Sequence, residues 1–389
     1  MKYISTEKIP IKMWIENIED GALEQVKNLA NLPFAFRHIA IMPDSHQGYG
    51  MPIGGVMATK GVVVPNAVGV DIGCGMCAVK TSLTEIDLET LKKIMGEIRK
   101  QIPLGFNRHK EAQDEDLMPD NPGFSGNLHY KIVEQEYQNA LKQIGTLGGG
   151  NHFIEIQKGS DGHIWIMVHS GSRNFGLKIA DYHNKLAKEL NEKWFSEVPK
   201  KWELAFLPLD SQEGQDYLNE MQYAVNFALA NRKLMMDRIT GIFYEKTEAN
   251  FDPVINIAHN YARIENHFGE NVMVHRKGAT LATEDTIGII PGSQGTKSYI
   301  VKGKGNQESF NSCSHGAGRK MGRKQAEREL NLKEEIERLD DQGILHAIRG
   351  VHDLDEAAGA YKDIQDVMKN QEDLVEVLVE LQPLAVIKG

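Results

Sequence analysis

Residues 164–172 read IWIMVHSGS, an apolar run that ends in histidine, serine and glycine. Such a run, rich in β-branched and aromatic side chains, predicts a buried strand with its polar residues at the strand end. The same pattern recurs in five other stretches, which are 39–46 (IAIMPDSH), 68–75 (VGVDIGCG), 254–260 (VINIAHN), 272–278 (VMVHRKG) and 287–294 (IGIIPGSQ). Because so many strand ends carry His, Asp, Cys or Ser, the sequence indicates one composite site.

The overall composition is that of a globular protein. The chain has 389 residues, of which 41% are hydrophobic and 25% charged, which excludes a disordered or collagen-like chain. There is no run of ~20 apolar residues and no charged-then-apolar leader, so we expect a cytoplasmic protein without a membrane span. Three cysteines are too few for a disulfide framework, and we expect them to be reduced. The formal net charge of −10 argues against a nucleic-acid partner.

Helical periodicity places helices between the expected strands, in residues 86–102, 129–144, 215–247, 333–339 and 353–381. Residues 186–220 carry Trp194, Phe195 and Trp202 among polar residues and predict a helical or irregular excursion. No repeat or linker divides the chain. We therefore expect an α+β fold (mixed α/β) in which residues 1–389 form a single large domain, with central mixed β-sheets flanked by helices.

Asp71 and Cys74 lie three residues apart on a glycine-rich turn (DIGCG), where a carboxylate and a thiolate can converge on one ion. With imidazole these ligands suit Zn²⁺ or Mn²⁺. The alternative is a tight turn with an inert buried cysteine. Cys74 and Cys77 also form a C-x-x-C pair with redox or structural-zinc spacing, but a structural zinc needs a second pair and only Cys313 remains.

Three histidines follow glycine turns or apolar strands in the same way. The turn GTLGGG leads into Asn151, His152 and Glu155, while His169 and His259 each end an apolar run. A lone histidine at such a position is more often a hydrogen-bonded core residue than a ligand. Together with the DIGC residues, however, they give five candidate ligands, which favours two metal ions that share Cys74.

The segment 312–320 (SCSHGAGRK) presents His315 on a glycine-flanked turn that runs into a basic stretch. Such an accessible imidazole could form a covalent intermediate, or the turn could bind an anion without a covalent role. Charge is uneven here: residues 291–330 hold eight Lys and Arg against three acids (+5), and residues 331–389 hold six against fourteen (−8). We interpret the acidic tail as solvated helices away from a phosphate-handling segment, which weakens the argument against nucleic acid.

Ten short motifs, in this order along the chain, resemble the RtcB family of RNA ligases. They are PDSHQGYGMPIGG, VGVDIGCGM, GTLGGGNHFIE, HSGSR, HN after a strand, RKGA, IIPGSQG, NSCSHGAGR, AYKDI and the final KG. Each motif is weak alone, and their combination is specific. The resemblance implies an RtcB-like fold and a ligase that joins RNA 3′-phosphate or 2′,3′-cyclic phosphate ends to 5′-hydroxyl ends with GTP and Mn²⁺, in RNA repair or tRNA splicing.

The resemblance also implies residue roles. His315 would be the nucleophile that becomes guanylylated, and two Mn²⁺ would be held by Asp71, Cys74, His152, His169 and His259. GTP or GMP would be bound by Asn151, His152, Phe153, Ile154, Glu155, His259, Asn260, Pro291, Gly292, Ser293, Gln294, Ser298, His315, Gly316, Ala317, Gly318 and Lys388. Candidates for contacts with RNA phosphates are Arg173, Arg276, Arg319, Lys320 and Arg323. The expected assembly is a monomer, with an archease-type activator as an optional partner.

Ser45, Asn174 and Ala358 depart from the family pattern, in which Val, Gly and Pro are usual. None of them is a proposed ligand or the nucleophile, so the departures bear on the RNA substrate rather than on the chemistry. Two other functions stay open: a two-metal phosphodiesterase that does not need a covalent histidine, and a non-catalytic RNA-binding protein.

Overall fold

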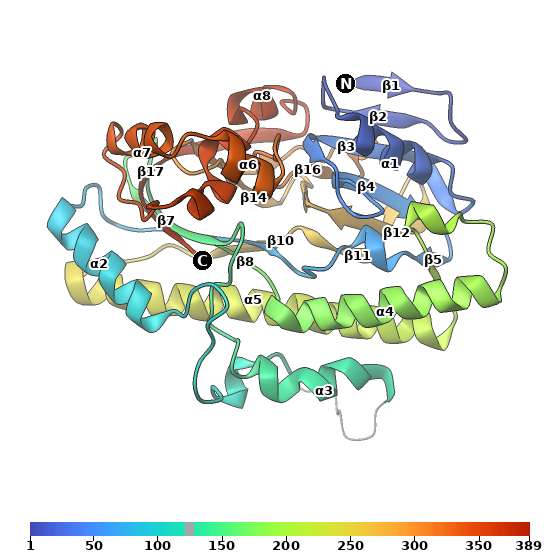
Figure 1. Cartoon of the computed structure of the whole chain (residues 1–389), viewed down its shortest axis with the longest axis horizontal. Helices are drawn as coiled ribbons and strands as arrows, with labels where there is room; N and C mark the ends of the chain where they lie inside the picture. Colours follow the sequence, from blue (N-terminus) through green and yellow to red (C-terminus); the bar gives the residue numbers. More distant parts are fainter. Residues whose placement is uncertain (121–127) are drawn as a thin grey trace.

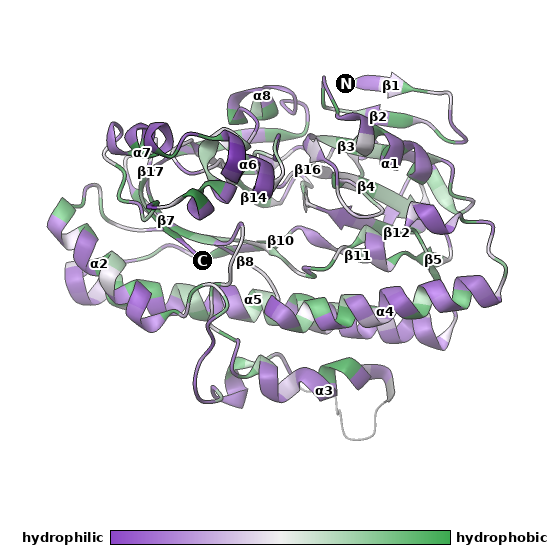
Figure 2. Cartoon of the chain, in the orientation of Figure 1, coloured by the Kyte–Doolittle hydropathy of each residue, from purple (hydrophilic) through white to green (hydrophobic). Residues whose placement is uncertain are grey.

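The structure is a computed structural model that describes residues 1–120 and 128–389. Two β-sheets occupy the centre, two long helices run along one side of them, and shorter helices cover the other side (Figure 1). Hydrophilic and hydrophobic residues alternate along the long helices α4 and α5 (Figure 2), as expected for helices with one buried face. No helix in the described part of the chain is long and apolar enough to cross a membrane.

The first sheet has six strands and is mixed. Its order is β1 (Lys2–Ile4), β2 (Ile11–Met13), β3 (Ala35–His46), β4 (Ile53–Thr59), β12 (Glu270–Lys277) and β11 (Asn260–His267). Only β2 and β3 are parallel neighbours, and helix α1 (Asp20–Ala30) makes the crossover that a parallel pair requires. This helix buries Ala22, Val26, Leu29 and Ala30, which share one face.

The second sheet has seven strands, and all neighbours are antiparallel. Its order is β10 (Ile255–Ala258), β6 (Gly75–Lys80), β8 (Ile164–Ser170), β7 (Phe153–Gly159), β17 (Val375–Lys388), β15 (Ser298–Gly303) and β14 (Ile287–Ile290). Strand β8 is buried throughout because its two faces belong to two different cores. Ile166 packs with Met235 and Ile239 of α5, whereas Met167 packs with residues of β6, β14 and β15.

Helices α2 (Leu88–Gln101), α3 (Lys131–Ala140), α4 (Arg173–Lys193) and α5 (Gln212–Thr247) lie on one side of the sheets (Figure 1). The fully buried Arg232 of α5 donates to the carbonyls of Gly73 and Ser170 and to the side chain of Asn256. Since Gly73 precedes Cys74 and Ser170 follows His169, this arginine fixes two of the strand ends predicted to carry ligands.

The remaining elements are short. They are α6 (Arg323–Glu329), α7 (Leu332–Asp340), α8 (Ile364–Lys369), the strand pairs β5 (Val62–Val63) with β9 (Leu207–Pro208) and β13 (Ala279–Leu281) with β16 (Ser312–Ser314), and the 3₁₀ turns η1 (Pro65–Ala67), η2 (Glu115–Leu117), η3 (Leu128–Tyr130), η4 (Lys200–Trp202), η5 (Gln307–Ser309), η6 (Val351–Glu356) and η7 (Ala358–Ala360). Residues 186–220, the predicted excursion, comprise the end of α4, η4, β9 and the start of α5.

The α+β fold class is confirmed, with one refinement: only the first sheet is mixed. The predicted strands in residues 39–46, 164–172, 254–260, 272–278 and 287–294 are confirmed, as are the helices in 86–102, 129–144, 215–247 and 333–339.

Two predictions of secondary structure are wrong. Residues 68–75 form a turn rather than a strand, because Gly69 and Gly73 adopt positive φ angles of 92° and 73°. Residues 353–381 are not one helix: they contain 3₁₀ turns, α8 and the first half of β17. The β-branched residues Val375, Val377 and Val379 recur with period two, and β15 and β7 pair with β17 on its two sides. The acidic tail is therefore not a set of solvated helices.

Candidate active site

A cavity of about 340 Å³ lies between the two sheets. The first sheet contributes residues of β3, β4 and β12, and the second contributes residues of β7, β8 and β17. Its lining residues are His46, Ile53, Gly69, Val70, Asp71, Cys74, Asn151, Phe153, Glu155, His169, His259, Asn260, Lys277, Gly278, Pro291, Gly292, Ser293, Gln294, His315, Gly316, Ala317, Gly318, Arg319, Arg323, Glu356, Tyr361 and Lys388. The strand ends singled out in the sequence thus meet at one cavity.

One end of the cavity holds a cluster of metal-ligating side chains. The Cys74 thiol lies 3.3 Å from Nε2 of His169 and 3.5 Å from Nε2 of His152, and all three residues are buried. The Asp71 carboxylate lies 3.1 Å from His152 Nε2. The rings of His169 and His259 are 5.3 Å apart. All five predicted ligands are therefore neighbours, although His152 itself does not line the cavity.

Backbone contacts orient two of these histidines. Nδ1 of His152 lies 3.0 Å from the carbonyl of Leu147, and Nδ1 of His169 lies 2.9 Å from the carbonyl of Asn151. These carbonyl contacts turn the Nε2 atom of each ring toward Cys74. This is the arrangement in which protein histidines bind metal.

Two glycines beside the candidate ligands, Gly75 and Gly171, allow the chain to pass close to its neighbours. A methyl group on Gly75 would lie 1.9 Å from the carbonyl oxygen of Ile257, and one on Gly171 would lie 2.2 Å from the Asp71 carboxylate. Larger residues at either position would push β10 or Asp71 out of place. The glycines of VDIGCG and HSGS therefore position the candidate ligands.

The electrostatics of the cluster also fit a cation. Burial lowers the pKa of both His169 and His259 well below the usual range, so both imidazoles are neutral. Burial and the nearby Asp71 carboxylate raise the pKa of the Cys74 thiol. Burial opposes ionisation of Asp71, but the hydrogen bond and charge of His152 hold its pKa below the usual value. A bound cation would compensate for the buried carboxylate and make the thiolate accessible at neutral pH.

His315 lies next to His259, and the centroids of their two rings are 4.7 Å apart. Its Nδ1 lies 2.6 Å from Oδ2 of the fully buried Asp44, and the same oxygen accepts from the backbone N–H groups of His315 and Gly316. Burial raises the pKa of Asp44, but the charge and hydrogen bond of His315 dominate and lower it. The contact therefore fixes the ring with Nδ1 toward the Asp44 carboxylate and Nε2 directed away from it.

The cavity lining also includes most of the predicted nucleotide-binding residues. Burial raises the pKa of Glu155 to about 8, and the Lys388 amine lies 5.7 Å above the Phe153 ring. Three predicted residues do not line the cavity: His152, which belongs to the metal-ligand cluster, Ile154 and Ser298. Ile154 points into the opposite core, and the hydroxyl of Ser298 accepts from the backbone N–H of Gly292, so it supports the loop.

The predicted RNA-contacting basic residues divide into two groups. Arg319 and Arg323 line the cavity, where both form ion pairs with Glu356. Arg173, Arg276 and Lys320 do not line it. The Arg173 guanidinium donates to Thr146 and to the carbonyl of Gly105, and the fully buried Arg276 pairs with Glu265 on β11, so neither side chain is free for a phosphate.

Sequence reasoning missed Asp44, which contacts His315, and several cavity residues, among them His46, Lys277, Glu356 and Tyr361. Asp44, His46 and Lys277 lie near the ends of predicted strands, and a polar residue at a strand end is the signal that could have identified them. The other two lie in the acidic tail, which was wrongly placed away from the site. Burial lowers the pKa of Lys277 to about 7, while its amine donates to the carbonyls of Tyr49 and Asn66.

The three departures from the family pattern lie outside the cavity lining. Ser45 is buried in β3, Asn174 is in the first turn of α4, and Ala358 begins η7. All three cysteines are free and buried, and Cys77 lies in the core beneath β6, so the C-x-x-C pair is not a disulfide.

Comparison with known proteins identifies the family. The profile of a family described as "tRNA-splicing ligase RtcB" matches residues 25–389. The chain is 39% identical to the RNA-splicing ligase RtcB of Escherichia coli K12, over 99% of both chains. It is 31% identical to the tRNA-splicing ligase RtcB of Thermococcus kodakarensis, over 95% of this chain and 92% of the relative. These matches confirm the resemblance seen in the motifs, and the chain belongs to the RtcB family of RNA-splicing ligases and is an enzyme.

Proposed function

We propose that this enzyme is a GTP- and Mn²⁺-dependent RNA ligase that works through a covalent histidine–GMP intermediate at His315. It would join RNA 3′-phosphate or 2′,3′-cyclic phosphate ends to 5′-hydroxyl ends. The observation that carries the proposal is the Asp44–His315 contact of 2.6 Å, which directs the second imidazole nitrogen, Nε2, away from Asp44 beside the buried Cys–His cluster. Family membership supports RNA ligation, and this geometry supports His315 as the nucleophile.

In the first step Nε2 of His315 attacks the α-phosphorus of GTP. A phosphorus–nitrogen bond forms, the bond to the bridging oxygen breaks, and pyrophosphate leaves. Asp44 stabilises the positive charge that develops on the imidazole, as the carboxylate does in other buried carboxylate–histidine pairs. Gly316, Ala317 and Gly318 line the same cavity, and a glycine-rich turn of this kind is suited to phosphate oxygens.

Two Mn²⁺ would be held by the Asp71, Cys74, His152, His169 and His259 set, with Cys74 shared. Bound there, they would neutralise charge on the phosphate oxygens. The protein's part is to present three imidazoles, a carboxylate and a thiol in a buried cluster. A set with both imidazole and thiolate suits a transition metal rather than Mg²⁺ or Ca²⁺.

In the second step the phosphoramidate passes GMP to the RNA 3′-phosphate. The phosphorus–nitrogen bond breaks and a pyrophosphate linkage forms, so that GMP becomes the leaving group when the 5′-hydroxyl attacks. Arg319 and Arg323 line the cavity and would contact RNA phosphates, and such contacts position the strand without reading its bases.

Intact-mass measurement after incubation with GTP and Mn²⁺ tests the proposal, together with sealing of a 3′-phosphate/5′-hydroxyl nick. A mass increase of one GMP that maps to His315, followed by sealing, is the expected result. A protein that hydrolyses phosphodiesters without any adduct would instead be the two-metal phosphodiesterase, and one that binds RNA without either reaction would be non-catalytic.

Asp44→Asn should slow guanylylation by about 10²- to 10⁴-fold, because an amide neither stabilises the imidazolium nor fixes its tautomer as a carboxylate does. The single-turnover rate of adduct formation measures the effect. Asp373→Asn is the matched control, because that carboxylate accepts from Trp14 far from the cavity lining. Equal rates in the Asp44 variant and the wild type would remove the carboxylate from the mechanism.

Glu155→Gln should stabilise the ligand-free protein at alkaline pH. The folded-state pKa of about 8 lies above the ordinary value, so folding disfavours the ionised carboxylate and stability falls as pH rises from about 5 through 8. Because the amide does not ionise, the free energy of unfolding of Glu155→Gln should exceed that of the wild type by little at pH 5 and by roughly 5 kcal/mol at pH 9. Urea denaturation at both pH values measures it, with the exposed Glu376→Gln on β17 as control. A stability difference between Glu155→Gln and the wild type that does not change with pH would contradict the raised pKa of Glu155.

A further inference from the structure

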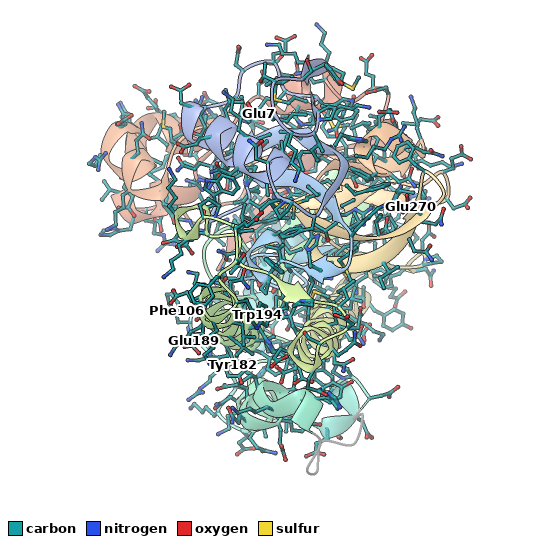
Figure 3. The ribbon with its side chains drawn as sticks, turned by 90° about the vertical axis from the view of Figure 1, so that its right-hand side faces the viewer. Glu7, Phe106, Tyr182, Glu189, Trp194 and Glu270 are labelled. Carbon is teal, nitrogen blue, oxygen red and sulfur yellow. The ribbon has the colours of Figure 1, made fainter. Side chains whose placement is uncertain are left out.

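Phe106 is a fully exposed aromatic residue close to the cavity. It follows α2 in the segment 102–110, and Figure 3 places it at the edge of the molecule. An isolated exposed apolar residue is unremarkable by itself. Phe106 differs because its backbone is held against the glycine turn that precedes Asn151 and His152, and because basic residues follow it in the sequence.

The backbone around Phe106 is fixed by several contacts. The N–H of Gly105 donates to the carbonyl of Gly148 at 3.0 Å, and Leu104 forms a parallel bridge with Gly148. The Arg173 guanidinium donates to the carbonyl of Gly105 at 3.3 Å. On the other side, His109 donates its N–H to the carbonyl of Lys142. The ring is thus exposed on a well-anchored segment.

The turn that holds this segment also reaches the cavity. A methyl group on Gly149 would lie 3.7 Å from Cα of Gly105, and one on Gly150 would lie 2.6 Å from the Arg323 guanidinium. Arg323 lines the cavity, and Asn151 follows the turn directly. Phe106 is therefore separated from the cavity rim by one short glycine turn.

The charges around the ring suit a polyanion. Arg108 and Lys110 are exposed on the same segment, and the Arg323 side chain is half exposed on the rim. The acidic residues of this region begin at Glu111, beyond the contact with Lys142. Exposed aromatic rings interleaved with basic side chains are how proteins bind single-stranded nucleic acid without reading its sequence.

We propose that Phe106 is a stacking platform for an unpaired base of the RNA strand whose end occupies the cavity. The inference rests on the proposed RNA-ligase function and adds a base-binding position outside the cavity. Arg108, Lys110 and Arg323 contact the phosphates on either side of that base. Because any base offers a π-face, the platform does not restrict the sequence of the RNA.

Fluorescence anisotropy with labelled single-stranded RNA tests the platform, using one oligonucleotide with a 3′-phosphate and one with a 5′-hydroxyl as the only reactive end. Phe106→Ala should weaken binding of one of them by roughly 5- to 150-fold, the range for loss of one base–aromatic stack. Phe106→Trp should restore it and Phe106→Leu should not. The oligonucleotide that responds identifies which strand is stacked.

Phe195→Ala is the matched control. This ring is also almost fully exposed, but it follows the end of α4, about 30 Å along the helix from Arg173 at its start. Its removal should leave RNA affinity unchanged. Equal affinity of Phe106→Ala and the wild type for both oligonucleotides, restoration by Leu as well as Trp, or an equal loss in Phe195→Ala would each overturn the platform.

Guanylylation with GTP and Mn²⁺ in the absence of RNA separates this inference from the proposed function. Phe106 does not line the cavity, so the Phe106→Ala protein should still form its GMP adduct. If Phe106→Ala forms the adduct and binds both oligonucleotides as the wild type does, the stacking platform is contradicted and the proposed function is not. A wild-type protein that forms no adduct contradicts the proposed function, and one that binds neither oligonucleotide contradicts the platform.

Discussion

His315→Ala should give a folded protein that forms no GMP adduct and seals RNA roughly 10⁴- to 10⁶-fold more slowly than the wild type, the loss typical of removing a covalent nucleophile. Asp44, His259 and the glycine turn would still surround the vacated position, but none of them can replace Nε2 of the imidazole. Intact-mass measurement and a nick-sealing time course measure the two effects.

The control for His315→Ala is His352→Ala. The His352 side chain is 90% exposed on η6 and lies outside the cavity lining, so its loss removes an imidazole without touching the site. Equal melting temperatures for both variants and the wild type would show that the fold is intact. An adduct that persists in His315→Ala, on whatever residue, would show that the nucleophile has been misassigned.

The candidate metal cluster was predictable from the sequence because each ligand has a local signal. Asp71 and Cys74 lie on one glycine-rich turn, and His169 and His259 each end an apolar strand. Their convergence was not predictable, because it depends on β6 pairing with both β8 and β10. Strand pairing between distant segments leaves no mark in single-sequence periodicity.

Lys388 illustrates the same limit. Its place in the cavity follows from the register of β17 on β7, which sets Lys388 opposite Phe153. The resemblance to the family pointed to this lysine, whereas periodicity placed a helix just before it. Asp44 shows the opposite case: its strand was predicted, but its role depends on a side-chain contact with His315, 271 residues away in the sequence.

Cys74→Ser should abolish Mn²⁺ binding at the shared position and with it guanylylation. The thiol is within 3.5 Å of two imidazole Nε2 atoms, so a serine hydroxyl would occupy the same space with a much weaker ligand. Loss of an outer-shell partner typically costs 10- to 100-fold in metal affinity or activity, and loss of a ligand shared by two ions should exceed that, at more than about 100-fold. Metal analysis after gel filtration and the rate of adduct formation measure the two losses.

Cys77→Ser provides the matched control, because it makes the same chemical change three residues away. Cys77 is as buried as Cys74, but it packs with the core beneath β6 and not with the histidines. A buried hydroxyl without a designed partner should lower the stability by about 1–3 kcal/mol while metal content stays unchanged. If both variants retained the wild-type metal content and adduct rate, Cys74 would be a core residue like Cys77, and the cations would have to be held by Asp71 and the histidines alone.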